Sequence, residues 1–165
     1  RVVIIGGGAV GVETALFLAE KGTLSGDMVR FLLINRAEPL DDLYDLATRG
    51  AKDVTLIEML DRIGPDIGRS TRWGMMQDIE RHHVKTLAKT RARAITPTAV
   101  IVEDAQGARE IPADSVVLAL GSRSCNPLEV PVRERGLPYQ IIGDARKVAK
   151  AMDAIHEGFE AGARL

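Results

Sequence analysis

Residues 2–13, which run VVIIGGGAVGVE, constrain the fold more than any other segment. Residues 2–5 are apolar and β-branched, the pattern of a strand buried on both faces of a parallel sheet. The motif Gly6-x-Gly8-x-x-Gly11 follows at once, and apolar residues then recur at helical spacing until Gly22, a helix stop signal. A strand, a glycine-rich turn and a helix in this order hold a dinucleotide pyrophosphate, so the segment predicts a Rossmann-like nucleotide-binding domain.

The three glycines of this motif have separate predicted roles. Gly6 permits the tight turn, Gly8 lets the backbone approach the phosphates, and Gly11 lets the helix pack closely on the strand. The unpaired N–H groups and the positive dipole end of the helix then hold the pyrophosphate without a dedicated lysine or arginine. The alternative is a glycine-rich turn at an ordinary strand–helix junction, because this motif alone is a weak signal.

Glu58 is the candidate acidic partner for the ribose of a bound dinucleotide. It closes the apolar run of residues 54–57, where a carboxylate can accept hydrogen bonds from ribose hydroxyls. It lies much further from the glycine motif than the usual offset of about 20 residues, so either Glu58 is an unrelated surface glutamate or residues 23–53 form an insertion. We favour the insertion, because a proline, two aspartates and an apolar face predict a helix there from about Pro39 to Arg49.

The same carboxylate bears on the choice of cofactor. A negative charge at Glu58 repels the 2′-phosphate of NADP, which favours NAD. Arg62 lies close in sequence, and an arginine near the ribose accommodates that phosphate, so NADP stays open as an alternative.

Composition and charge predict a single globular domain over residues 1–165 with no affinity for nucleic acid or membranes. Charged residues make up 27% of the chain, their signs are interspersed and the net charge is −1, so no basic face is indicated. We expect a cytoplasmic protein, because no apolar run is long enough to span a bilayer and no signal peptide is recognisable.

The chain starts at Arg1, directly on the first strand, so we expect it to be a piece of a larger protein. The lone Cys125 excludes an internal disulfide and a cysteine-ligated iron–sulfur cluster.

The remaining sequence predicts more elements of an α/β fold. A helix is expected within residues 65–81, with Ser70 as its N-cap and Trp73, Met76 and Ile79 in the core. His82 and His83 follow it without a partner at metal-ligand spacing, so we predict a structural role for them and no metal site. Short β segments at 84–87, 90–95, 99–103 and 109–111 predict a small antiparallel meander, and residues 114–121 a buried strand that ends in glycine.

The predicted architecture is therefore a Rossmann-like three-layer β/β/α domain. It has a central parallel sheet, the antiparallel β-meander, and the helical insertion over 23–53 between the first helix and the second strand. Residues 139–165 are expected to form a C-terminal strand and helix, the helix running over 146–163 with Asp144 as a possible cap.

Five segments together carry a resemblance to a known group of enzymes. They are residues 5–13 (IGGGAVGVE), 54–59 (VTLIEM), 70–73 (STRW), 113–121 (ADSVVLALG) and 142–145 (IGDA). This set resembles the pyridine-nucleotide-binding region of FAD/NAD-dependent oxidoreductases. The insertion and the Arg72-Trp73 pair make it most similar to the modular 2,4-dienoyl-CoA reductase and 2-enoate reductase group, which are relatives of old yellow enzyme.

The resemblance implies that this domain takes part in a chain of electron-transfer steps. NAD(P)H docks here and reduces FAD, and electrons pass through an iron–sulfur cluster to FMN in a separate barrel that reduces the substrate. The implied partners are thus the FAD-binding and FMN-barrel domains of a parent polypeptide, with residues 139–165 joining the FAD-binding part. The implied cofactor contacts are Gly6, Gly8, Ala9, Val10, Gly11, Glu13, Glu58, Met59, Arg62, Leu120, Gly121, Ser122, Gly143 and Asp144.

Some of these contacts have specific implied roles. Leu120, Gly121 and Ser122 would line the nicotinamide side, and Glu13 would point towards the nicotinamide ribose or carboxamide. Gly143-Asp144 matches a motif whose aspartate contacts the flavin in the intact enzymes. No side chain of this chain is expected to catalyse a step directly, because the cofactors carry the hydride chemistry.

The sequence also departs from the group. A first flavin-binding glycine motif, the iron–sulfur cysteines and the FMN barrel are missing from these residues, so we expect the isolated chain neither to bind FAD tightly nor to reduce an enone. Two alternatives stay open: a free-standing NAD-binding or sensing module, and a fragment whose glycine motif binds the ADP half of FAD.

Overall fold

The computed structural model, which describes residues 1–164, separates the chain into two units, Arg1–Leu120 and a second that begins at Gly121. The first contains, in order, β1 (Val2–Ile5), α1 (Ala9–Ala19), α2 (Gly26–Ile34), α3 (Leu40–Thr48), β2 (Val54–Ile57), α4 (Arg69–Arg81), β3 (Lys85–Leu87), β4 (Arg91–Ile95), β5 (Ala99–Asp104), β6 (Gly107–Pro112) and β7 (Ser115–Leu118). The second contains α5 (Glu129–Glu134), the short 3₁₀ helix η1 (Gly143–Ala145) and α6 (Ala151–Gly162).

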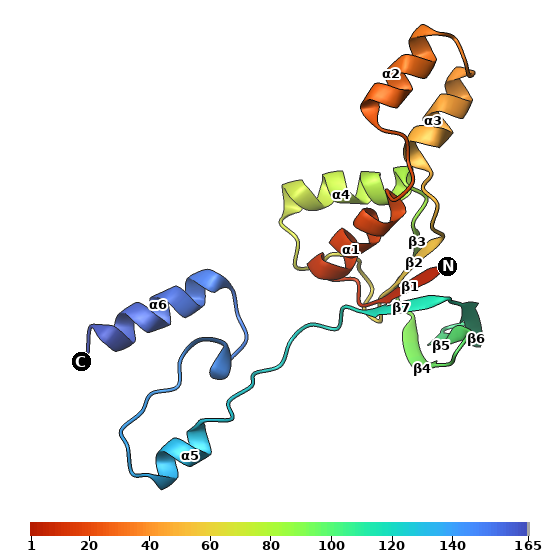
Figure 1. Ribbon diagram of the computed structural model, residues 1–165. Coiled ribbons are helices and arrows are strands. Elements are labelled where there is room, and N and C mark those ends of the chain that lie inside the picture. The colour runs from red at the N-terminus through yellow and green to blue at the C-terminus, as the bar shows by residue number, and fades with distance from the viewer. Residues whose placement is uncertain (165) are drawn as a thin grey trace. The chain divides into compact units, whose positions relative to one another are not determined.

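A parallel sheet with strand order β3-β2-β1-β7 forms the centre of the first unit (Figure 1). β1 lies between β2 and β7, so Val3 pairs with Thr55 on one side and with Val116 on the other. In β1 and β2 almost every side chain is buried, as the continuous apolar runs predict for strands covered on both faces.

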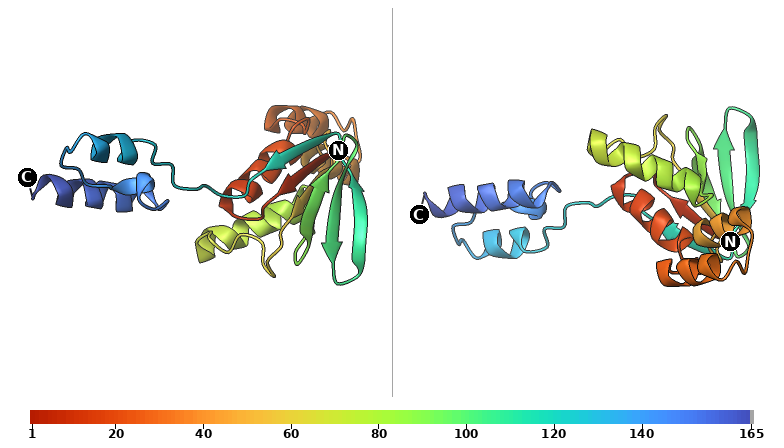
Figure 2. Two further views of the ribbon diagram at one scale, coloured as in Figure 1. Left: turned by 90° about the horizontal axis from the view of Figure 1, so that it is seen from below. Right: turned by 90° about the horizontal axis from the view of Figure 1, so that it is seen from above.

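Alternate side chains of these strands enter two separate cores. Ile4 and Leu56 face α1 and α4, where they meet Val12, Ala15 and Ile79. The other face, carrying Val3, Ile5 and Ile57, packs on the antiparallel sheet β4-β5-β6 through Val100, Val102 and Ala113. Figure 2 shows the three layers, with the meander opposite the helices. Burying each of these aliphatic side chains completely stabilises the fold by about 1.5–3 kcal/mol. The parallel sheet between helices on one side and an antiparallel sheet on the other confirms the predicted β/β/α fold class.

The segment between α1 and β2 forms two helices, where the sequence predicts one. α3 begins just after Pro39 as expected, and α2 precedes it and lies beside it (Figure 1). Ser25 caps α2, because its Oγ accepts the N–H of Met28 at 3.3 Å, and this cap is the signal that would have revealed the helix. Ala51 donates its N–H to the carbonyl of Lys21 at 2.7 Å, which closes the base of the insertion.

Four further expectations for the first unit are wrong. β7, which corresponds to the buried strand expected over 114–121, lies at the edge of the central sheet, and Leu118 at its end is 61% exposed. α4 begins at Arg69, with Gly68 and not Ser70 at the N-cap position. The side chain of Trp73 is 68% exposed, whereas Met76 and Ile79 pack in the core as predicted. β3, expected in the meander, instead pairs in parallel with β2, because the chain after α4 returns to the edge of the central sheet.

His82 and His83 lie at the end of α4. The Nδ1 atom of His82 is 2.8 Å from the carbonyl oxygen of Thr48, so the imidazole links α4 to the end of α3. Within residues 1–164 no group of three or more His, Cys, Asp or Glu side chains is placed to hold a metal ion. No helix in this described part combines the length and apolar composition that a transmembrane span requires.

The second unit differs from the expected C-terminal strand and helix. Its described residues contain no strand, and α6 begins at Ala151 rather than at residue 146. Asp144 therefore does not cap α6; its carboxylate accepts the N–H of Ala149, which precedes the helix, at 3.3 Å. The first turn of α6 is stabilised instead by Asp153, whose carboxylate accepts the N–H of Lys150 at 3.0 Å.

Candidate functional site

The glycine turn joins the carboxyl end of β1 to the amino end of α1 without space for side chains at two of its glycines. Gly6 has a φ of 112°, and a Cβ there would overlap the carbonyl oxygen of Ala119, just after β7. A Cβ on Gly11 would overlap the carbonyl oxygen of Gly6 itself. The helix therefore lies directly against the strand, and α1 begins at the edge of the sheet where β1 ends.

Glu58 lies beside this turn and is only 8% exposed. Its Oε2 accepts the N–H of Gly7 at 2.6 Å, and its Oε1 accepts the N–H of Leu60 at 2.8 Å. Because an ionised carboxylate can accept about four hydrogen bonds, acceptor capacity is left for ribose hydroxyls. The insertion thus lengthens the chain between Gly11 and Glu58 without separating them in space.

The turn has the features that a pyrophosphate requires. The N–H groups of Val10 and Gly11, in the first turn of α1, have no acceptor among residues 1–164. Such orphan donors, together with the positive end of the helix dipole, favour an anion. The backbone at Gly6 and Gly11 is packed too closely for side chains, so the residues present fit the phosphate group of a dinucleotide.

Asp66 is a residue of this site that sequence reasoning missed. Both oxygens of its carboxylate accept the N–H of Ala9, at 2.9 and 3.1 Å, so it occupies the anion position at the start of α1. It lies in the loop between β2 and α4, far from the glycine motif in sequence. No local signal identifies it, because the contact depends on where this loop returns after β2.

The other predicted site residues fall into two groups. In the first unit the predicted side chains are exposed and come from three separate segments: Val10 and Glu13 on α1, Met59 and Arg62 after β2, and Leu120 after β7. Glu13 is the fifth residue of α1 and so lies beyond its first turn. Gly121, Ser122, Gly143 and Asp144 belong to the second unit.

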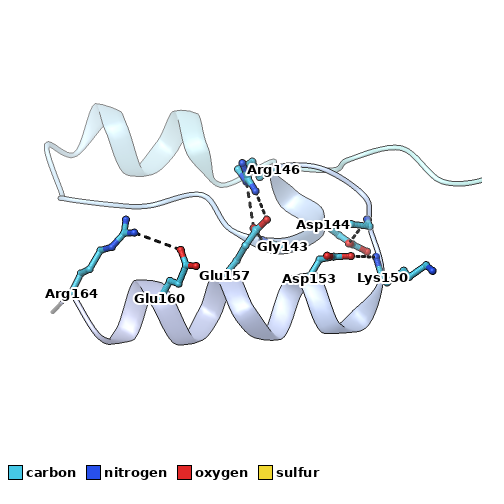
Figure 3. A network of polar contacts seen from close by, with 9 residues as sticks. Gly143, Asp144, Arg146, Lys150, Asp153, Glu157, Glu160 and Arg164 are labelled. Atoms are coloured by element: carbon cyan, nitrogen blue, oxygen red, sulfur yellow. Dashed lines mark hydrogen bonds and ion pairs between the residues drawn. The ribbon is translucent and has the colours of Figure 1, made fainter.

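In the second unit, a hydrogen bond and an ion pair hold the turn at Gly143 against α6 (Figure 3). Gly143, with a φ of 60°, donates its N–H to Oε2 of Glu157 at 2.7 Å, and the guanidinium of Arg146 pairs with the same carboxylate. The hydrogen bond from Arg146, and after it that from Gly143, lowers the pKa of Glu157 below its ordinary value. The same pair raises the pKa of Arg146. The network fixes the backbone next to Asp144, whose own side chain is exposed.

Known proteins resemble this chain over most of its length. A family model for pyridine nucleotide-disulphide oxidoreductases matches residues 1–149. A protein of Desulforamulus reducens named metal reductase is 48% identical over 159 residues, which cover 96% of this chain and 24% of that protein. A protein of Thermoanaerobacter brockii named NADH oxidase is 32% identical over 162 residues, which cover 97% of this chain and 20% of that protein.

Solved structures share the fold. A 2-naphthoyl-CoA reductase, in complex with 2-naphthoyl-CoA, superimposes with a TM-score of 0.70 at 23% identity, over 99% of this chain and 21% of that one. The chain therefore spans a quarter or less of the length of each of these three relatives.

Proposed function

The chain belongs to the pyridine nucleotide-disulphide oxidoreductase family, and on this premise we propose that it is the NAD(H)-binding domain of a larger flavin-dependent oxidoreductase. In this proposal it holds NADH so that the nicotinamide meets an FAD bound elsewhere in the parent protein. The observation that carries the proposal is the glycine turn with Glu58 beside it, because the two together match the pyrophosphate and the ribose of a dinucleotide.

The residues of the chain bind and orient the cofactor. The N–H groups of Val10 and Gly11 donate to the pyrophosphate, and the spare lone pairs of Glu58 accept ribose hydroxyls. Met59 and Leu120, both exposed at strand ends, offer apolar surface for the rings of the dinucleotide. When bound, the dinucleotide supplies the hydride, and the protein contributes position and exclusion of water.

We propose NADH rather than NADPH as the bound form. The carboxylate of Glu58 would repel a 2′-phosphate, and the relative from Thermoanaerobacter brockii carries the name NADH oxidase. Arg62 is exposed in the loop that follows Glu58 and is the residue that would favour NADPH if this assignment were wrong.

The final electron acceptor is proposed to lie outside this chain. The sequence resemblance supports an enoate or dienoyl-CoA-like acceptor, reduced at an FMN-containing barrel that receives electrons through an iron–sulfur cluster. The relatives carry different names, metal reductase and NADH oxidase among them, so the names do not identify one acceptor. The identity of the acceptor is therefore to be tested on the parent protein.

A calorimetric titration of the chain with NADH, NADPH and FAD tests the proposal. We expect NADH to bind more tightly than NADPH, and FAD not to bind stoichiometrically. Glu58→Gln should weaken NADH binding about tenfold, because the amide oxygen is uncharged and has fewer lone pairs left to accept the ribose hydroxyls than the carboxylate. Glu110→Gln, an exposed change in β6, is the matched control.

Each opposite result removes a part of the proposal. Tighter binding of NADPH would reverse the cofactor assignment, and stoichiometric FAD would make the chain a flavin-binding fragment. Absence of binding of both reduced dinucleotides would overturn the function. Circular dichroism of each variant separates loss of binding from loss of folding.

A further inference from the structure

The N-terminus of α1 already has an anion. The N–H of Ala9 donates to both carboxylate oxygens of Asp66, at 2.9 and 3.1 Å. A Cβ added to Gly8 would lie 3.3 Å from Oδ2 of the same residue, so the carboxylate lies against the backbone of the glycine turn. This is the surface that a pyrophosphate must approach.

The loop that carries Asp66 is fixed at its middle and exposed at its end. Gly64 donates its N–H to the carbonyl of Gly7 at 2.6 Å, Ile63 is buried, and Arg72 donates its Nε–H to the carbonyl of Ile63 at 2.8 Å. Asp66 itself is exposed. Its side chain can therefore leave the N–H of Ala9 without disturbing the buried part of the loop.

A carboxylate and a pyrophosphate compete for this position. Both are anions attracted by the same N–H groups and dipole, and two like charges at one helix end repel each other. We propose that Asp66 is an internal competitor of the dinucleotide: it caps α1 in the nucleotide-free chain and is displaced when the pyrophosphate binds. This inference rests on the proposed function, and it makes Asp66 a residue that lowers the affinity for any ligand with that phosphate group.

Two substitutions separate the charge of Asp66 from its hydrogen bonds. Asp66→Ala removes both, and Asp66→Asn keeps an oxygen that accepts the N–H of Ala9 but removes the charge. Asp61→Asn, an exposed aspartate of the same loop, is the matched control. Each protein is titrated with NADH, with ADP-ribose, which carries the pyrophosphate, and with adenosine, which does not.

We expect Asp66→Ala to bind NADH and ADP-ribose about fivefold more tightly than the unaltered chain, the factor that corresponds to the roughly 1 kcal/mol of a lost helix cap. Asp66→Asn should bind both more tightly by a smaller factor, and Asp61→Asn should be unchanged. Adenosine binding should be the same in all four proteins. Without nucleotide, Asp66→Ala should also unfold at a lower temperature, because α1 loses its cap.

The results that would contradict this proposal differ from the result that would contradict the proposed function. Equal or weaker binding of NADH by Asp66→Ala, when the unaltered chain binds it, overturns the competitor and leaves the proposed function standing. A gain for adenosine equal to that for ADP-ribose also overturns it, because the effect would then not involve the phosphate. Absence of NADH binding by the unaltered chain and by both Asp66 variants overturns the proposed function together with this inference.

Discussion

Replacing Gly11 with alanine tests whether α1 must lie directly against β1. A Cβ at this position would overlap the carbonyl oxygen of Gly6, lie 3.0 Å from its carbonyl carbon and 3.4 Å from Cδ1 of Leu56. The oxygen belongs to the backbone of the turn and cannot rotate away as a flexible side chain would. The helix must therefore move outwards from the sheet.

Two opposing effects set the magnitude. Alanine favours a helix over glycine by about 0.8–1 kcal/mol, whereas excess volume in a well-packed region costs about 1–3 kcal/mol. Because the overlap here is with a backbone atom, we expect the cost to exceed the gain, with a net loss of about 1–2 kcal/mol in the free energy of unfolding. At about 2–4 °C per kcal/mol for a chain of this size, the Tm falls by about 2–8 °C.

The chain supplies a matched control in Gly74. It lies inside α4, and a Cβ there would meet no atom within 4 Å. Gly74→Ala should therefore raise the free energy of unfolding by up to about 1 kcal/mol. Thermal and urea unfolding followed by far-ultraviolet circular dichroism measure both variants. If Gly11→Ala is as stable as Gly74→Ala, the close approach of α1 to the turn is wrong.

Three further outcomes are expected. Trp73, the sole tryptophan, should show the red-shifted emission of an exposed indole and be quenched by acrylamide; a blue-shifted, protected emission contradicts its placement. Arg72→Ala should lower the free energy of unfolding in urea by about 1 kcal/mol through the lost bond to the loop before α4, and an unchanged value refutes that bond. Because Arg146 and then Gly143 lower the pKa of Glu157, its contribution to stability is complete above the ordinary glutamate pKa and is lost as the pH falls through the lowered pKa. The amide signal of Gly143 in nuclear magnetic resonance spectra should shift in that acid range, and Glu157→Gln should abolish the shift.

Local signals were sufficient for the strand, turn and helix of the nucleotide motif. Residues 2–5 and 54–57 are rich in apolar, β-branched side chains, and a Cβ on Gly11 would overlap the carbonyl oxygen of Gly6, five residues earlier. These properties are set within a few residues of the chain. Glu58 was also predictable once the insertion was recognised, because its position at a strand end fixes which edge of the sheet it faces.

Contacts between distant segments were not predictable from the same signals. β3 has the short, half-polar sequence of a meander strand, and only its return to β2 places it in the central sheet. Trp73 follows the apolar spacing of its helix, yet the sheet is already covered beneath α4 by Met76 and Ile79. Asp66 lies in an exposed loop, and its role arises only because that loop passes the start of α1.

A titration of the isotopically labelled chain with NADH, followed by two-dimensional nuclear magnetic resonance spectroscopy, tests the central claim most directly. The amide signals of Gly8, Ala9, Val10 and Gly11 should shift progressively and saturate, while that of Gly26 in the insertion stays in place. Saturating shifts confined to other parts of the chain, or unchanged spectra at millimolar NADH, would contradict the claim that the glycine turn holds a pyridine dinucleotide.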